Sequence, residues 1–461
     1  MAEKKLWWQK PGFGIQYQIE ARPGWRWNRN YEKFNASMMD ENRNLKFNGP
    51  LCKMKDWVEF SRQIGVDYHI FEVKWHDGIC YFNTKYTNWK TPEDYVQIYA
   101  EESRKARIPF MFYYSSIFDH NPQFDAIQPL KTCTPSYFTL RTTFILRKTL
   151  IQGFSFVFAI GAGILFKLNR IFRRYPKDKS AKWFDHFRFT PFKDDPKTYE
   201  IYMFNQLTEL VTKYKPDGLW MDWYMLSLED SAYKIMDFME KKYPDVVLTF
   251  NDSIDSKLRW AHYTTAEAHD VKAAWNKGNR YRRNKSPWEL IGPAANAWDN
   301  FLPRPDPHEA ARMAAILMAS GGKACFGMPA QMDGTLYAGP AGQLAQFGQW
   351  YKKRKALFQD ATPMDYKGQK VPGIAVKEKH VKTIGCIHGN DPLIHLIYLF
   401  GVPRQDLIVK FCRKNWDALE KILLEPEQQE LDFTKDALEI TLTIPKQDVD
   451  QTDTILRLKM K

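Results

Sequence analysis

The fold of this chain is read most directly from residues 214–224, Tyr214-Lys215-Pro216-Asp217-Gly218-Leu219-Trp220-Met221-Asp222-Trp223-Tyr224. Pro216 and Gly218 follow a helical segment, and a short apolar run then carries one carboxylate, Asp222, between two tryptophans. Strands of a parallel barrel are buried on both faces and read as such apolar runs, and barrel enzymes carry their chemistry at the C-terminal ends of the strands. Asp222 is therefore predicted to be a functional carboxylate at the end of a barrel strand.

Asp222 also has a purely structural interpretation, because an aspartate can cap a helix that follows it. The flanking Trp220 and Trp223 favour a sugar site instead, since the apolar C–H faces of pyranose rings stack on indoles. Aromatic residues make up 15% of the chain and include 16 Trp. This excess agrees with carbohydrate binding, although aromatic side chains also fill protein cores.

The rest of the N-terminal part alternates strand and helix patterns. Strands are predicted over 13–19, 66–73 and 108–114, and helices over 54–64, 92–106 and 196–214, with Thr91 as the cap of the second helix. Alternation at this spacing favours a parallel sheet closed into a barrel. A chain of 461 residues has room for one barrel of about 250 residues and a smaller second domain. We expect a (β/α)8-like TIM barrel over residues 1–360.

From about Asp365 the chain changes to shorter alternating segments without long helices. Strands are predicted over 371–376, 380–387, 393–399, 407–411, 437–444 and 454–458. Residues 365–461 are therefore expected to form an antiparallel β-sandwich.

An apolar segment, Leu150–Leu168, interrupts the barrel pattern and has basic residues on both sides. Its length is near the roughly 17–25 residues of a membrane span, but one crossing would separate strands of a single sheet. Three interpretations stay open: a helix lying in the membrane interface, a hairpin-like insertion, and sequence foreign to the native fold. We interpret residues 140–192 as an insertion that the barrel does not need. Membrane contact is expected only through 150–168.

Composition narrows the class of protein further. The chain is 44% hydrophobic and 26% charged, as in folded globular proteins. The formal charge of +13 comes without a nucleic-acid-binding motif, so no nucleic-acid partner is expected. Six scattered cysteines without a CxxC pair indicate no metal site, and no cofactor is predicted. No signal peptide is visible, which favours the cytoplasm. The oligomeric state is not predicted.

Four sequence blocks resemble the α-L-fucosidase family of glycoside hydrolases, in the family's order. They are Lys74-Trp75-His76-Asp77-Gly78 with Thr87-Asn88-Trp89, then Trp220-Met221-Asp222, then Pro287-Trp288-Glu289 with Trp298, and finally Gly321-Gly322 with Asp333-Gly334-Thr335. The resemblance covers the chain outside the insertion. It implies a barrel, a C-terminal β-sandwich, a carbohydrate substrate and hydrolysis with retained configuration through an aspartate nucleophile.

The resemblance also implies roles for individual residues. Asp222 corresponds to the nucleophile, and Glu289 and Glu267 compete for the acid/base role. Trp288 beside Glu289 would raise the pKa of that carboxyl, as an acid catalyst requires, and this modestly favours Glu289. His76 is the candidate for binding sugar hydroxyls.

Further side chains are candidates for substrate binding around these carboxyls. They are Lys74, Trp75, Tyr114, Trp223 and Trp298. Where the family has a His-Trp-Gly segment the chain has Gln18-Ile19-Glu20, and Trp75 replaces a family histidine, so Gln18 and Glu20 join the candidates. These departures predict weaker binding of fucose. They also leave a related α-L-glycoside as an alternative substrate.

Two other classes of function stay open. The altered residues and the insertion fit a non-catalytic or repurposed carbohydrate-binding barrel, and the apolar segment fits a membrane-associated scaffold. The retained Asp222, accompanied by a glutamate, favours catalysis over both.

Overall fold

The computed structural model describes residues 7–19, 40–42, 45–46, 51–75, 77–116, 119, 121, 196–222, 229–251, 253–255, 261–298 and 300–461. The predicted insertion at 140–192 and the site candidates Glu20, His76 and Trp223 lie outside these residues.

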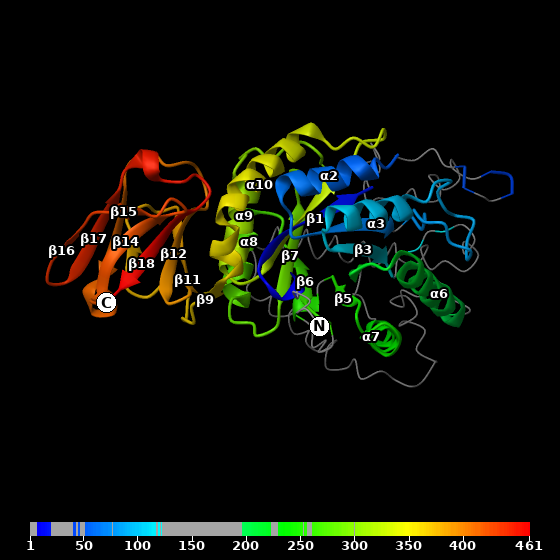
Figure 1. Cartoon of the computed structure of the whole chain (residues 1–461), viewed down its shortest axis with the longest axis horizontal. Coiled ribbons are helices and arrows are strands. Elements are labelled where there is room, and N and C mark those ends of the chain that lie inside the picture. Colours follow the sequence, from blue (N-terminus) through cyan, green and yellow to red (C-terminus); the bar gives the residue numbers. More distant parts are fainter. Residues whose placement is uncertain are drawn as a thin grey trace, which may run out of the picture.

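The N-terminal part of the chain forms a nearly closed eight-stranded parallel barrel, which confirms the predicted fold (Figure 1). The order around the sheet is β5-β4-β3-β2-β1-β8-β7-β6. The strands are β1 Gly12–Gln18, β2 Tyr68–Lys74, β3 Phe110–Ser115, β4 Gly218–Asp222, β5 Val247–Phe250, β6 Thr264–Glu267, β7 Trp288–Pro293 and β8 Lys323–Pro329. Because all strands point the same way, their C-terminal residues meet at one end of the barrel.

Helices cover the outside of the barrel. They are α2 Met54–Ile64, α3 Tyr95–Ala106, α6 Pro196–Tyr214, α7 Glu229–Lys242, α8 Val271–Tyr281, α9 Glu309–Ala319 and α10 Ala338–Gln359. The bounds of α2 and α6 are those predicted. The prediction for α3 was wrong at its start, because Asp94 and not Thr91 is the cap: the Asp94 carboxylate accepts a hydrogen bond from the amide of Gln97 at 3.1 Å.

Alternate residues of each strand face two different cores, as β2 shows. His69, Phe71 and Val73 face the helices, and His69 lies between the hydroxyls of Ser61 on α2 and Ser103 on α3, at 3.0 and 2.9 Å. Tyr68 and Ile70 instead belong to a cluster inside the barrel. This period of two places the side chain of Glu72 on the inner face.

The sheet has a seam between its two edge strands, β5 and β6. In the described part of the chain these strands are joined by side chains and one backbone hydrogen bond, from His262 to Leu248 at 3.0 Å, rather than by a ladder. Thr249 donates its hydroxyl to the Tyr263 carbonyl at 2.7 Å, and Thr265 donates to the Phe250 carbonyl at 3.0 Å.

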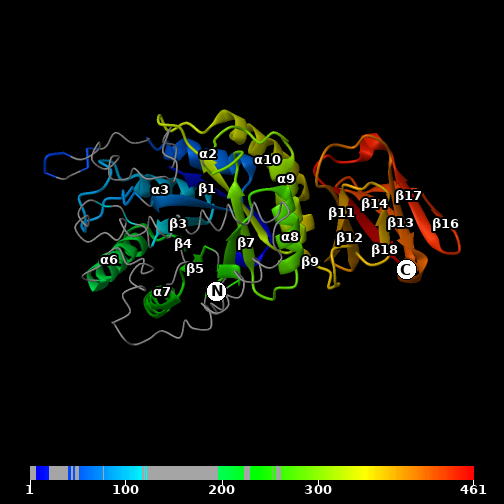
Figure 2. The same ribbon diagram turned by 180° about the vertical axis from the view of Figure 1, so that it is seen from behind.

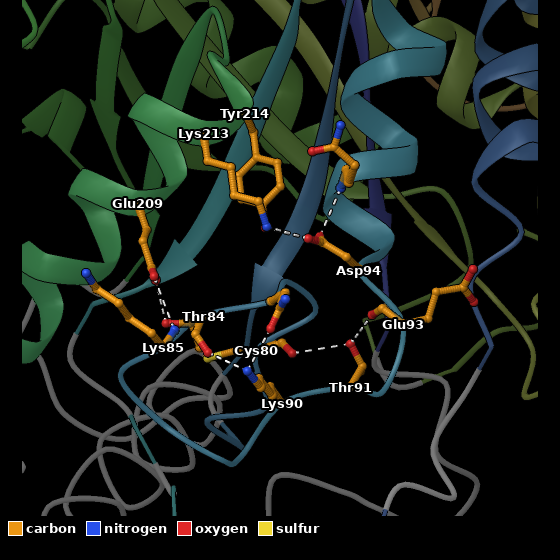
Figure 3. Close-up of polar contacts among 12 residues, drawn as sticks. Cys80, Thr84, Lys85, Lys90, Thr91, Glu93, Asp94, Glu209, Lys213 and Tyr214 are labelled. Carbon is orange, nitrogen blue, oxygen red and sulfur yellow. Dashed lines mark hydrogen bonds and ion pairs between the residues drawn. The ribbon is translucent and has the colours of Figure 1, made fainter.

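The long connection between β2 and α3 is tied to α6 at two places (Figure 3). Glu209 accepts hydrogen bonds from the Thr84 hydroxyl at 2.6 Å and from the Lys85 amide at 3.1 Å. At the other place Lys213 and Tyr214 both donate to the Asp94 carboxylate at 2.8 Å. Because α6 leads directly into β4, these bonds fix the approach to the strand that carries Asp222.

The C-terminal part is a sandwich of two antiparallel sheets, as predicted, and it lies beside the α9 and α10 side of the barrel (Figures 1 and 2). One sheet has the order β10-β13-β17-β16 and the other β15-β14-β18-β12-β11-β9. Their bounds are β9 Ala361–Pro363, β10 Ile374–Val376, β11 Val381–His388, β12 Asp391–Tyr398, β13 Leu407–Cys412, β14 Leu419–Glu425, β15 Gln429–Leu431, β16 Phe433–Lys435, β17 Glu439–Ile444 and β18 Thr454–Met460.

Buried polar contacts join the barrel to the sandwich. Arg312 on α9 is fully buried and donates to the carbonyls of Gln451 and Gly401 at 2.9 and 2.7 Å. Cys386 on β11 donates to the carbonyl of Ala319 at 3.0 Å. Of the helices that the structure describes, none is both long enough and apolar enough to cross a membrane.

Candidate active site

Asp222 is the last residue of β4 and lies at the C-terminal end of the barrel, as predicted. Its carboxylate accepts hydrogen bonds from the Tyr113 hydroxyl at Oδ2 and from Asn251 Nδ2 at Oδ1, the latter at 2.9 Å. The residue is 7% exposed. The next helix that the structure describes, α7, begins at Glu229, so Asp222 is not its cap. Two donors hold this carboxylate as an oriented anion at the strand end.

Asn251, directly after β5, links Asp222 to a second carboxyl. Its Nδ2 also donates to Glu267 Oε1, at 3.2 Å. Glu267 is the last residue of β6, so both carboxyls stand at strand ends on the same side of the barrel. The two accepting oxygens are no further apart than the sum of the two bond lengths. The structure thus brings Asp222 and Glu267 together around one amide.

Glu267 has two further donors. His269 Nε2 lies 2.9 Å from Oε2, and Trp298 Nε1 donates to the same oxygen at 3.3 Å. Burial alone would raise the pKa of Glu267, but the hydrogen bonds and charge of His269, with those of Asn251 and Trp298, lower it below its ordinary value. The side chain is 33% exposed, so it can be reached from solvent.

Trp298, Gln18 and Trp75 lie around this end of the barrel interior. A side chain at Gly327 would collide with the Trp298 ring at 2.3 Å and with Gln18 Nε2 at 2.7 Å, so both predicted residues pack over that glycine on β8. Trp75 and Trp298 are partly buried against the cluster inside the barrel. These three candidates therefore lie on the side of the barrel where the strand-end carboxyls stand.

Glu289, the modestly favoured acid/base, lies elsewhere. It is the second residue of β7, near the N-terminal end of that strand, and is fully buried. Its carboxylate accepts hydrogen bonds from the Tyr68 hydroxyl and from Trp220 Nε1, the latter at 3.0 Å. Burial raises its pKa, while the Lys323 charge and these hydrogen bonds oppose the rise. The structure does not bring Glu289 into the group around Asp222.

Lys74 and Tyr114 also lie away from that group. Lys74 is fully buried and pairs with Asp119 at 2.6 Å, and its ammonium stands 4.2 Å from the centre of the Tyr114 ring. Tyr114 donates its hydroxyl to Gln206 on α6 at 2.7 Å. Both side chains therefore fill the space between the sheet and α6, where they support β2 and β3 from outside.

Three residues of the site were not predicted: Asn251, Tyr113 and Glu72. Asn251 could have been found as the first polar residue after the apolar run of β5. Tyr113 was passed over in favour of Tyr114, its neighbour on the opposite face of the strand. Glu72 is a lone carboxyl in a buried strand, and it accepts hydrogen bonds from Gln16 Nε2 at Oε1 and from the Ile19 amide at Oε2, each at 3.0 Å.

The negative charge of Asp222 acts on the pKa of the Glu72 carboxyl. Burial raises the pKa of Glu72 to about 8, the negative charges of Asp222 and Asp77 add to the rise, and the two hydrogen bonds from β1 oppose it. Within the described residues no three His, Cys, Asp or Glu side chains gather as a metal would require. The carboxyls that the structure places at this end of the barrel, Asp222, Glu267 and Glu72, can serve as nucleophile, acid or base.

Comparison with known proteins gives the family and the fold of the chain. The family model described as Alpha-L-fucosidase matches residues 5–356. The structure resembles an α-fucosidase of Thermotoga maritima, with a TM-score of 0.61, 17% identity and coverage of 98% of this chain and 96% of that one. It also resembles isoenzyme 1 of the α-L-fucosidase from Paenibacillus thiaminolyticus, with a TM-score of 0.62, 16% identity and coverage of 99% of this chain and 98% of that one. The structure of a trapped covalent intermediate of an α-L-fucosidase from Bacteroides thetaiotaomicron is similar too, with a TM-score of 0.59, 16% identity and coverage of 98% of this chain and 94% of that one. No curated protein matches the chain.

Proposed function

Because the chain belongs to the α-L-fucosidase family, we propose that it hydrolyses α-L-fucosides or closely related α-L-glycosides with retained configuration, using Asp222 as nucleophile and Glu267 as acid/base. The observation that carries this proposal is the Asn251 amide shared by the two carboxyls, at 2.9 and 3.2 Å. Carboxyls of retaining glycosidases stand about 5–5.5 Å apart, and those of inverting enzymes about 6.5–9.5 Å. The sum of the two bond lengths lies below the inverting range, which supports retention.

In the first step Asp222 attacks the anomeric carbon and its carboxylate becomes a glycosyl ester, while Glu267 gives its proton to the departing oxygen. In the second step Glu267 takes a proton from water, the water attacks the anomeric carbon, and Asp222 leaves as a carboxylate. Tyr113 and Asn251 orient the carboxylate of Asp222 before attack. Trp298 and Trp75 offer indole faces for the sugar ring.

Glu267 suits the acid/base role better than Glu289 for reasons of access, although the pKa of Glu267 is lowered and that of Glu289 is raised. Its side chain is 33% exposed and at a strand's C-terminal end, whereas Glu289 is fully buried at the other end of β7. An acid catalyst has to reach the leaving group and later admit a water molecule. Glu289 meets neither requirement.

Azide distinguishes the two roles. We expect Asp222→Ala to lose nearly all turnover of nitrophenyl α-L-fucoside and to form the β-azide when azide is added, since azide then attacks the substrate directly. With Glu267→Ala, azide attacks the glycosyl ester from the side that water uses, so the α-azide is expected.

Glu289→Ala serves as the matched control, and it should yield no azide product of either configuration. An α-azide from Glu289→Ala, with none from Glu267→Ala, would reverse the assignment. Wild-type protein that turns over neither nitrophenyl α-L-fucoside nor α-L-galactoside would instead favour the non-catalytic carbohydrate-binding alternative.

A further inference from the structure

Glu72 and Gln16 form a polar pair inside the barrel, one layer from the carboxyls of the proposed reaction. Glu72 is 1% exposed and Gln16 2% exposed, and their side chains are joined by the 3.0 Å hydrogen bond from Gln16 Nε2 to Glu72 Oε1. Gln16 Oε1 is buried and, among the residues the structure describes, has no hydrogen-bond partner. A buried amide carbonyl without a donor is costly, which indicates that something else supplies the donor.

The pair belongs to the same end of the barrel as Asp222. Glu72 Oε2 accepts from the backbone amide of Ile19, directly after β1, so the carboxyl reaches the C-terminal end of that strand. Across the sheet Glu72 is level with Tyr113, which in turn donates to Asp222. The negative charge of Asp222 contributes to the raised pKa of Glu72.

The acid form of Glu72 has a hydrogen to donate, and its direction is restricted. Both carboxyl oxygens already accept hydrogen bonds from β1, and the Gln16 amide and the Ile19 amide can only donate there. The carboxylic hydrogen must therefore take a position on the carboxyl that neither of these two donors uses, and such a position is available for a ligand. One donor, from Glu72, and one acceptor, Gln16 Oε1, then lie side by side.

A donor next to an acceptor matches a hydroxyl group, which accepts one hydrogen bond and donates another. We propose that Glu72 and Gln16 together bind one ring hydroxyl of the sugar and so determine which α-L-glycoside reaches Asp222. This inference rests on the proposed function and deepens it, because it concerns the recognition of the same substrate. It assigns the sugar contact to the β1–β2 side of the barrel, across the sheet order from Glu267 on β6.

The test measures, by calorimetry, binding of L-fucose and of its single-deoxy analogues, each lacking one ring hydroxyl. One analogue should bind wild-type protein about threefold to tenfold more weakly than fucose because of the lost pair of contacts. In Gln16→Met that ratio should approach one for the same analogue, while the ratios for the other analogues stay unchanged. Gln206→Met, which alters a buried glutamine between the sheet and α6, should change no ratio.

A pH series adds a readout that a purely structural role would not move. Among the described residues, the titratable groups facing Glu72 are Asp222 on β4, Tyr113 on β3 and Asp77 after β2, while Gln16 and Ile19 contribute hydrogen-bond donors. Titration of the other groups changes the affinity for L-fucose and for its deoxy analogue by the same factor. This factor cancels in the ratio of the two affinities. In wild type the ratio for the sensitive analogue should fall as pH rises through about 8, when Glu72 loses its hydrogen. Glu72→Gln keeps a donor at every pH, so its ratio should stay constant.

Two results would overturn the inference while leaving the proposed function intact. One is an equal loss of affinity for all analogues in Gln16→Met, which would show that the pair only supports the end of β1. The other is a ratio that is independent of pH in wild type. Failure of the azide experiment or of fucoside turnover would instead remove the proposed function.

Discussion

The rings of Tyr113 and Trp220 are stacked inside the barrel, with centroids 5.4 Å apart and an interplanar angle of 19°. Their polar atoms bond to different carboxyls, because the Tyr113 hydroxyl donates to Asp222 while Trp220 Nε1 donates to Glu289. The stack therefore separates two groups: a strand-end site with Asp222, and a lower cluster of Glu289, Tyr68 and Lys323. Each group should respond differently to substitution.

Replacing Tyr113 by Phe should lower kcat about tenfold or more, since a hydrogen bond to a charged group contributes about 1.5–3 kcal/mol. The stacked ring is kept, so the free energy of unfolding should change little. Tyr114→Phe is the matched control on the next residue of the same strand. It loses the bond to Gln206 outside the barrel, so it should lower stability and leave kcat near wild type. The opposite pattern in the two variants would refute the assignment of faces.

Glu289→Gln should act on stability rather than on chemistry. The charge it removes faces buried Lys323, whose pKa burial lowers to about 8 despite the opposing charge of Glu289. We expect a loss of about 1–3 kcal/mol in the free energy of unfolding, measured by urea denaturation. The ratio of rates on poor and activated leaving groups should match wild type. Glu267→Ala should instead slow the poor leaving groups selectively.

His269 should control the pH range of turnover through Glu267. Its hydrogen bond and charge lower the pKa of Glu267, and an acid catalyst works only while it holds its proton. Removing the imidazole with His269→Ala should therefore raise the pKa of Glu267 and move the alkaline limb of kcat/KM to higher pH. His308→Ala, which alters the residue before α9, provides a control. An unchanged limb in His269→Ala would show that another group sets it.

The buried pair of His395 and Asp453 should make the stability of the protein depend on alkaline pH. The two side chains are 2.6 Å apart and fully buried. Burial lowers the pKa of His395, but the negative charge of Asp453 and the hydrogen bonds to Asp453 and Cys386 outweigh it and raise the pKa from 6.5 to about 10. A raised folded-state pKa gives stability that is complete below about 6.5 and is lost as pH rises toward 10.

Denaturation between pH 6 and pH 10 measures this loss, which should approach about 1.4 kcal/mol per pH unit in the steepest part. His395→Gln should be less stable at pH 6 and should lack most of the slope. The exposed His380→Gln should retain it. Identical slopes in wild type and His395→Gln would contradict the prediction.

Much of the architecture could be predicted from patterning. The bounds of α2 and α6 were correct because a helical apolar stripe ends at Gly65, which has φ 74°, and because Pro216 follows Tyr214. Strands β15 and β16 were missed, since three residues carry too little periodicity, and the seven-residue strand β14 was missed as well. The start of α3 was misplaced because Thr91 and Asp94 are both acceptable caps, and only packing chooses between them.

The site was harder to predict than the fold because it depends on strand phase and depth. Asp222 follows a strand whose end is marked by its own sequence, so its place was predicted. Glu289 and Glu267 each neighbour aromatic or histidine residues, and the sequence alone does not say that Glu289 begins a strand while Glu267 ends one. Tyr113 and Tyr114 differ only in phase, which the apolar run of β3 leaves undetermined.

The seam between β5 and β6 has a consequence for the distance on which the proposed chemistry depends. Asp222 stands on one side of this joint and Glu267 on the other, with Asn251 reaching across it. Elsewhere in the barrel a backbone ladder would hold such a spacing, but here the hydroxyls of Thr249 and Thr265 hold it together with one backbone hydrogen bond, from His262 to Leu248. These two threonine side chains thus help to set the distance between the carboxyls of Asp222 and Glu267. Their replacement would change that distance although both carboxyls are kept.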